Sequence, residues 1–446
     1  MKIIIAGAGS VGFHLAELLA YENQDIVLID LDQDVLDYAS THTDVLTIKG
    51  DCASIDVLEQ ANISNADLLL AVTTSEKTNL ITAILAKKMG AKQTIARVSN
   101  EEYLHDDQKK IFRELGIDSI ISPVQLAAKE ISKLVKQAYF TDIFEFEEGN
   151  INLVGVTLDE YSDLVDVGVR DLPTFSSEVN LRPIAILRGH QTIIPRGDTI
   201  FRQNDHVYFI TKKDRIDELK KIIDRREIEM HNIMIIGGTE LAQATARKLE
   251  KIYSVTLIEK DKNTCKQLAE NLNDTLVIHG NFSDFDLLLE EGLENMDAFI
   301  ALAENAETNI IACLTAENHG VYKTIALVEN KEYVHVSQNI GVDTLINKKL
   351  IAANNIFRYI RKGKVEAVIT LHGVDAEVIE YEIQKSNQLT RKPLKELHFP
   401  QTALIGSVIR EGTSHFPNGD FQIKIGDKVI VFALPNAIAR LDKLFR

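Results

Sequence analysis

Three glycines near the start of the chain have the spacing of a phosphate-binding turn. Gly7, Gly9 and Gly12 follow the apolar run 2–6 and precede a segment with helical periodicity. In such a strand–turn–helix unit the first glycine permits a tight turn, the second lets backbone amides approach a pyrophosphate, and the third lets the helix lie close to the sheet. The helix N-terminus adds unpaired N–H groups and the positive end of its dipole. The predicted nucleotide-binding turn comprises Gly7, Ala8, Gly9, Ser10, Val11 and Gly12.

An acidic residue, Asp30, ends the next apolar run at the separation expected for a dinucleotide fold. Its carboxylate would accept hydrogen bonds from the adenosine ribose hydroxyls and would repel a 2′-phosphate. The pattern therefore favours NAD(H) or an adenine nucleotide, ATP or ADP, over NADP(H). The alternative interpretation is a structural strand–helix turn that binds no ligand.

Four other residues are candidates for ligand contact. Ligands in such sheets bind where the strand order reverses, between the loops after the first and fourth strands, and Thr73 and Thr74 lie in the latter loop. Asp51 follows the third strand, where it could bond an adenine amino group or cap the helix that begins near Ser54. Arg97 ends the fifth strand, where it could meet phosphates or be an ordinary, partly exposed arginine.

The elements that must position these residues occur twice in the chain. One offset of 230 residues relates Gly7 to Gly237, Gly50 to Gly280 and Asn79 to Asn309. Self-similarity at so long a period indicates repeated domains rather than a short-repeat solenoid. In the first copy, strand-like runs alternate with helix-period segments, which is typical of a parallel sheet covered on both faces. The expected strands are Lys2–Ala6, Ile26–Asp30, Val45–Ile48, Leu68–Val72, Thr94–Val98 and Ser119–Ile121.

A second kind of segment follows each doubly wound domain. Short alternating runs such as Leu153–Val156 and His206–Ile210 predict a small, mainly β domain, and an offset of 222 residues relates Arg188 to Arg410 within its two copies. The segment 214–229 is interpreted as a closing helix and a linker between the halves. The fold prediction is α/β, with two doubly wound Rossmann-like domains, each followed by a small mainly β domain. The predicted domains are 1–138, 139–225, 226–362 and 363–446.

The second copy of the turn keeps the fold signal but loses chemical features. Gly237 and Glu259 correspond to Gly7 and Asp30 and stay candidate ligand-binding residues, but Thr239 stands at the second motif glycine. Glu240 lies inside the turn, where its charge would oppose a phosphate. Asp51 and Arg97 become Asn281 and Leu327. We therefore expect the second site to be empty, weak or different in preference.

Composition excludes several classes of function. The 446-residue chain has a net charge of −17 without a basic cluster, which opposes binding to nucleic acid or to an anionic lipid surface. No apolar run is long enough to cross a bilayer, so a cytoplasmic protein without direct membrane insertion is expected. The three cysteines show no metal-ligand spacing, so no metal is expected. No catalytic constellation is evident, and His14 and His42 near the first turn are interpreted as surface histidines.

The order of motifs resembles that of the RCK (KTN) family, whose domains regulate potassium transport. The resemblance is carried by the turn 7–12, Asp30, Asp51, the run 96–98 and the small-domain segment 194–198, and it covers essentially the whole chain. Two units in tandem look like the cytosolic nucleotide-binding subunits of Trk-type potassium uptake, the TrkA family.

The resemblance implies a regulator rather than an enzyme. In that family, RCK_N (Rossmann-like) and RCK_C (small) domains of several chains build a homo-oligomeric ring beneath a membrane-embedded potassium-translocating partner. NAD(H) and competing ATP or ADP bind the large domains and shift the ring between shapes that open or close the pore. Carried over to this chain, Gly7, Gly9 and Gly12 would hold phosphates, Asp30 the ribose and Asp51 the base. Thr73 and Thr74 would form the opposite wall, and Arg97 would meet a phosphate.

Two alternatives stay open from the sequence. One is an NAD-dependent oxidoreductase whose substrate groups are not evident. The other is an RCK regulator of a different ion channel or exporter. Hydride turnover would distinguish the first from a regulator, because a regulator binds NADH without consuming it.

Overall fold

The computed structural model forms two compact units, residues 1–127 with 347–356, and residues 128–346 with 357–446. It describes residues 1–20, 24–146, 150–172, 181–189, 191–223, 229–329, 342–360, 365–370, 376–397 and 399–445. Helix α6 (Pro123–Lys136) begins in the first unit, and residues 347–356 of the first unit include most of helix α14 (Lys348–Ile360).

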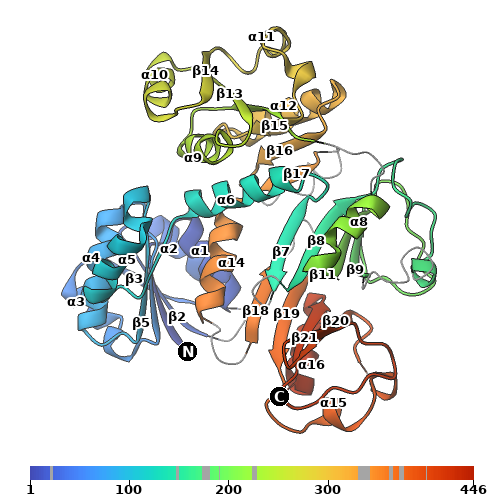
Figure 1. Ribbon diagram of the computed structural model, residues 1–446. Helices are drawn as coiled ribbons and strands as arrows, with labels where there is room; N and C mark the ends of the chain where they lie inside the picture. The colour runs from blue at the N-terminus through green and yellow to red at the C-terminus, as the bar shows by residue number, and fades with distance from the viewer. Residues whose placement is uncertain are drawn as a thin grey trace. The chain divides into compact units, whose positions relative to one another are not determined.

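The first unit is built on a six-stranded parallel sheet of order β3-β2-β1-β4-β5-β6. Apart from Lys2, the residues of its two central strands, β1 and β4, are apolar and buried, because helices cover both faces of the sheet (Figure 1). The order reverses between β1 and β4, as the sequence predicts. The strands are β1 (Lys2–Ala6), β2 (Asp25–Asp30), β3 (Leu46–Lys49), β4 (Leu68–Ala71), β5 (Gln93–Arg97) and β6 (Ser119–Ile121).

The helices of this sheet begin at capping residues supplied by the sequence. Asp32 accepts a hydrogen bond from the Asp34 N–H at the start of α2, and Ser75 accepts one from Thr78 at the start of α4. The helices before α6 are α1 (Ser10–Ala20), α2 (Gln33–His42), α3 (Ile55–Gln60), α4 (Glu76–Lys88) and α5 (Asp106–Glu114). The strands of this sheet begin and end within one residue of their predicted positions. The prediction that His14 is a surface histidine is wrong, because His14 is only 7% exposed to solvent.

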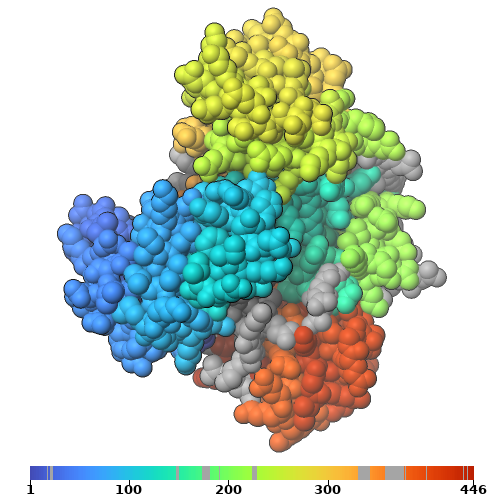
Figure 2. Space-filling model, turned by 60° about the vertical axis from the view of Figure 1, so that its left-hand side comes forward, coloured from blue at the N-terminus to red at the C-terminus, as the bar shows by residue number. Residues whose placement is uncertain are grey.

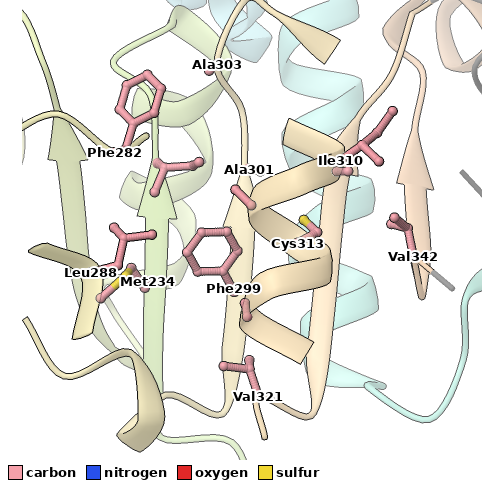
Figure 3. Packing of buried hydrophobic residues seen from close by; sticks show 14 of the residues in the cluster. Met234, Phe282, Leu288, Phe299, Ala301, Ala303, Ile310, Cys313, Val321 and Val342 are labelled. Atoms are coloured by element: carbon pink, nitrogen blue, oxygen red, sulfur yellow. The ribbon is translucent and has the colours of Figure 1, made fainter. Parts of the chain in front are cut away.

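The second unit contains a second parallel sheet with the same topology, order β14-β13-β12-β15-β16-β17. Figure 3 shows one face of it, where Met234 and Phe299 pack with Cys313 of helix α12 in a buried apolar cluster. Its strands are β12 (Asn232–Ile236), β13 (Ser254–Glu259), β14 (Thr275–His279), β15 (Ala298–Ala301), β16 (Lys323–Leu327) and β17 (Thr344–Ile346). Its helices are α9 (Glu240–Leu249), α10 (Lys262–Asn271), α11 (Phe285–Glu290) and α12 (Ala306–Asn318).

Two five-stranded antiparallel sheets form the small domains, with orders β10-β9-β11-β8-β7 and β18-β19-β22-β20-β21. The first comprises β7 (Asp142–Phe146), β8 (Ile151–Thr157), β9 (Leu181–Arg188), β10 (Gln191–Ile193), β11 (His206–Lys212) and helix α8 (Ile216–Ile223). The second comprises β18 (Val365–Thr370), β19 (Glu377–Glu382), α15 (Gln388–Arg391), β20 (Ala403–Arg410), β21 (Thr413–His415), β22 (Lys428–Ala433) and α16 (Pro435–Phe445). The linker part of the predicted segment 214–229 includes residues 224–228, which lie outside the described residues.

One buried ion pair recurs in both small domains. Arg188 donates two hydrogen bonds of 2.7 Å to the Asp205 carboxylate, and Arg410 donates two of 2.8 Å to Asp427. Both carboxylates are almost fully buried, so each needs its guanidinium partner.

The atoms of the second small domain are orange to red in the space-filling view, and those of the second parallel-sheet domain are yellow-green to yellow-orange (Figure 2).

The fold prediction is therefore confirmed as two doubly wound parallel sheets, each followed by a small antiparallel sheet. Among the described residues, no helix combines the length and apolarity needed to cross a lipid bilayer.

Candidate nucleotide-binding site

The first candidate turn lies at the point of the sheet where the strand order reverses. Gly7 donates its N–H to the Ile29 carbonyl at 2.8 Å and has a φ of +105°. A Cβ atom on Gly7 would lie 2.8 Å from the Thr73 nitrogen. The loops after β1 and β4 therefore approach so closely that only glycine fits at this position.

The other two motif glycines have different surroundings. A Cβ atom on Gly12 would lie 1.8 Å from the Gly7 carbonyl oxygen, which explains why the first turn of α1 needs a glycine there. A Cβ atom on Gly9 would meet no neighbouring atom within 4 Å, and both Gly9 and Ser10 are exposed. The protein itself therefore does not require a glycine at position 9. The open space lies at the N-terminus of α1, where a phosphate would gain most from backbone N–H groups.

Asp30 lies beside the turn and holds its backbone. One carboxylate oxygen accepts the Ala8 N–H at 2.6 Å, and the other accepts the Asp32 N–H at 3.0 Å. Each carboxylate oxygen has about two acceptor positions, so these two bonds leave acceptor capacity for ribose hydroxyls. Asp30 can therefore both shape the turn and receive a ribose.

Asp51 follows β3 next to this site and is exposed. Its carboxylate accepts the Ala53 N–H at 2.9 Å in the turn before α3, while Ser54 is the N-cap residue of that helix. The neighbouring Cys52 is buried, and burial raises the pKa of its thiol, with Asp51 and Asp30 adding to the rise. Cys52 therefore stays protonated near neutral pH and acts as a small apolar residue.

Thr73, Thr74 and Arg97 lie at the same edge of the sheet. Thr73 is partly buried and Thr74 is exposed, so both can contribute to a wall opposite the turn. Arg97 ends β5, and β4 separates that strand from β1. At the usual strand spacing this places the two backbones about 10 Å apart, a span that a long arginine side chain covers in large part.

A further residue, Asn79, joins the segments that contain Thr73 and Arg97 at this edge of the sheet. Asn79 is not among the site residues predicted from the sequence. Its side chain accepts the Thr73 N–H at 2.9 Å and donates to the Thr73 carbonyl at 3.1 Å and to the Arg97 carbonyl at 2.9 Å. Asn309 makes the equivalent bonds to Ala303 and Leu327 in the second copy. The signal in the sequence was the repetition of this asparagine in both halves.

The second candidate turn differs from the first by the side chain of Thr239. Thr239 caps the Ala242 N–H at 3.2 Å and donates to the Leu302 carbonyl at 2.9 Å, which bridges the loops after β12 and β15. Glu259 is only 7% exposed and accepts the Gly238 and Asp261 N–H groups at 2.5 and 2.7 Å. A threonine hydroxyl thus stands where Gly9 leaves open space in the first copy.

Within the described ranges, no group of three His, Cys, Asp or Glu side chains could hold a metal ion. The chain thus consists of two doubly wound domains, each followed by a small antiparallel domain, which is a tandem arrangement of the RCK class.

Comparison with known proteins shows the family. The TrkA-N domain model matches residues 3–123 and 233–348, and the TrkA-C domain model matches residues 153–224 and 378–446. The chain is 31% identical over 455 residues to the Trk system potassium uptake protein TrkA homolog 1 of Methanosarcina mazei, and the match covers 100% of both chains. It is 32% identical to the Trk system potassium uptake protein TrkA of Haemophilus influenzae, covering 100% of this chain and 99% of that one. The chain therefore belongs to the TrkA family.

Solved structures share the fold at low sequence identity. A crystal structure of the GsuK RCK domain aligns with a TM-score of 0.62 at 15% identity, covering 100% of this chain and 94% of that one. A structure titled "GsuK channel bound to NAD" aligns with a TM-score of 0.61 at 15% identity, covering 100% of this chain and 78% of that one. The resemblance to the RCK family and the predicted tandem RCK architecture are confirmed.

Proposed function

We propose that this protein is a nucleotide-sensing subunit that controls potassium translocation by a membrane-embedded Trk-type partner. The observation that carries the proposal is the first turn, where Gly9 leaves open space at the N-terminus of α1 beside the Asp30 carboxylate. Relatives covering the full chain are Trk potassium uptake proteins, which supports potassium as the transported ion.

NAD(H) is the proposed ligand of the first turn, with ATP and ADP as competing ligands. Structures with the same fold carry the titles "GsuK channel bound to NAD" and "GsuK bound to ADP", which supports both nucleotide classes. Gly7 to Gly12 would hold the phosphates and Asp30 the ribose, with Asp51 at the base, Thr73 and Thr74 opposite, and Arg97 at a phosphate. The second turn, with Gly237 and Glu259, is proposed to bind nucleotide weakly or not at all, because the Thr239 side chain stands where Gly9 leaves open space and already caps the Ala242 N–H.

Regulation would arise from a change in shape of a ring of chains. A ligand shifts such an equilibrium only if it binds one shape more tightly than the other, so NADH and ATP must differ in their preference for the two shapes. The proposed place of action is the cytoplasmic side of the membrane, through the protein partner.

The test has two parts. Calorimetric titration of the purified chain should give about one tight nucleotide site per chain, and two equally tight sites would contradict the proposed role of the second turn. Potassium flux through co-purified, reconstituted partner should then change between NADH and ATP in the presence of this chain and not in its absence. An identical flux with both nucleotides and without nucleotide would contradict control by ligand.

The alternative functions are tested in the same preparation. Consumption of NADH with a panel of small carbonyl and hydroxyl compounds would favour an oxidoreductase. Co-purification with a channel or exporter instead of a Trk-type partner would favour regulation of a different pore.

A further inference from the structure

A basic hollow lies between α15 and α16 of the second small domain. Its volume is about 380 Å³, and it is lined by Asn387, Gln388, Arg391, Arg440, Lys443 and Leu444. Three of the six lining residues are cations and none is a carboxylate, although the chain as a whole has a net charge of −17. Such a local reversal of sign concentrates positive potential in a concave site.

The polar groups of this hollow are mostly hydrogen-bond donors. Asn387 uses its side-chain oxygen to accept the Leu389 and Thr390 N–H groups at 3.0 and 3.3 Å. Its amide nitrogen is buried and has no hydrogen-bond partner. Within the part of the chain that the structure describes, no ion pair is formed by Arg391 or Lys443. The hollow therefore offers three cationic side chains and no carboxylate to a bound molecule.

The first small domain provides an internal comparison at the α15 side. Ser162 accepts the Leu164 N–H at 3.3 Å, as Asn387 accepts that of Leu389, and both leucines are fully buried. Ser162 therefore corresponds to Asn387, and Leu164 to Leu389. At the same offset, Gln388 and Arg391 correspond to Asp163 and Asp166 in the first copy.

The residues of α16 that line the hollow also differ in charge from their counterparts in the first small domain. The ion pairs of Arg188 and Arg410 fix the correspondence of the two small domains at 222 residues, and the fully buried Leu219 and Leu441 keep it in α8 and α16. Arg440 and Lys443 then correspond to Glu218 and Lys221. The four matched positions thus carry three acidic residues and one basic residue in the first copy, and three basic residues and none acidic in the second.

We propose that the hollow between α15 and α16 is a binding site for a small phosphate-bearing molecule. Guanidinium groups bind phosphate oxygens in a bidentate manner, and two arginines with a lysine can neutralise more than one phosphate charge. A volume of about 380 Å³ falls in the range of about 300–1,000 Å³ typical of small-molecule sites, so it admits an organic phosphate rather than an ion alone. This site is separate from the nucleotide-binding turns and does not depend on the proposed regulation of potassium flux.

The test uses pyrophosphate as the probe and the full chain in calorimetric titrations. In the variant R391D/R440E, two lining residues take the identities found in the first small domain, and pyrophosphate binding should weaken at least about tenfold, which is about 1.4 kcal/mol. Lys424→Asp reverses the charge of an exposed lysine of the same domain outside the hollow and serves as a control for a general effect of charge, with unchanged binding expected. Gly9→Ala perturbs the nucleotide-binding turn and should leave this binding event in place.

Three results would overturn the proposal. They are the absence of pyrophosphate binding outside the first turn, an equal loss in Lys424→Asp, and tighter binding of citrate than of pyrophosphate, which would indicate a carboxylate site. The charge-conserving variant R391K/R440K covers the case in which the reversed charges disturb folding. It should keep weaker binding because it retains the charge and loses the bidentate geometry.

Discussion

Replacing Gly9 by alanine should separate nucleotide binding from folding. A Cβ atom at this position would meet no neighbouring atom within 4 Å, and the residue has no positive φ, so the free protein can accept the methyl group. Alanine also restricts the unfolded chain, which gives an expected change in the free energy of unfolding between zero and a gain of about 1 kcal/mol. The thermal midpoint should therefore be unchanged or slightly higher.

The same methyl group should obstruct the ligand. It would occupy the space through which phosphate oxygens reach the backbone N–H groups at the start of α1. Loss of one charge-assisted hydrogen bond costs about 1.5–3 kcal/mol, so the Kd for NADH should rise about 10- to 100-fold in titrations of the full chain.

Gly12 and Thr239 provide the matched controls. Gly12→Ala places a Cβ atom 1.8 Å from the Gly7 carbonyl oxygen, so the backbone must move, and the free energy of unfolding should fall by about 1–3 kcal/mol. Thr239→Ala removes the cap of α9 at a cost of about 1 kcal/mol and should leave the NADH affinity unchanged. An unchanged Kd in Gly9→Ala, or a loss of stability equal to that of Gly12→Ala, would refute the reasoning.

The remaining predictions concern groups that hold the elements together. Asn79→Ala should weaken NADH binding and lower the thermal midpoint, because the Thr73 N–H and carbonyl lose their partner; a normal Kd would show that this loop does not face the ligand. Lys323 is fully buried and lies 2.8 Å from both Asp343 and the Phe140 carbonyl, so Lys323→Met should reduce the free energy of unfolding by about 3 kcal/mol in urea titrations. The Lys92 ammonium and the Lys2 N–H hold the pKa of Asp67 below its ordinary value. The ionised carboxylate therefore stabilises the fold above the unfolded-state pKa and ceases to do so as pH falls through the folded-state pKa. Asp67→Asn should accordingly be less stable than the parent at about pH 7, and the difference should shrink as pH falls below the unfolded-state pKa of Asp67; a difference that does not change with pH would contradict the ionic origin.

Much of the fold could be predicted, because the hydrophobic periodicity of the segments and the duplication of the chain indicate the same order of strands and helices. The central strands of both parallel sheets are mainly apolar and buried, as strands covered on both faces need to be, and the turn glycines mark where α1 and α9 begin. The buried state of His14 was not evident, because a histidine on an amphipathic helix gives no signal of its burial.

The turn of the candidate site could be predicted from the sequence, but the hydrogen bonds around it could not. The types and spacing of Gly7 and Gly12 follow from steric contacts that any such turn makes. The role of Asn79 depends on two loops that are brought together only in the folded sheet, so composition gives no indication of it. The basic hollow of the second small domain could not be predicted for the same reason, since Arg440 and Lys443 are distant from Asn387 and Arg391 in the sequence.

The second turn has a consequence for the shape of a dose–response curve. Under the proposal that Thr239 prevents binding at the second turn, each chain offers one responsive site, although it carries two domains of the same topology. The Hill coefficient of a concerted assembly cannot exceed its number of sites. The steepness of any response to nucleotide is then limited by how many chains assemble, and a coefficient above that number would mean that both copies respond.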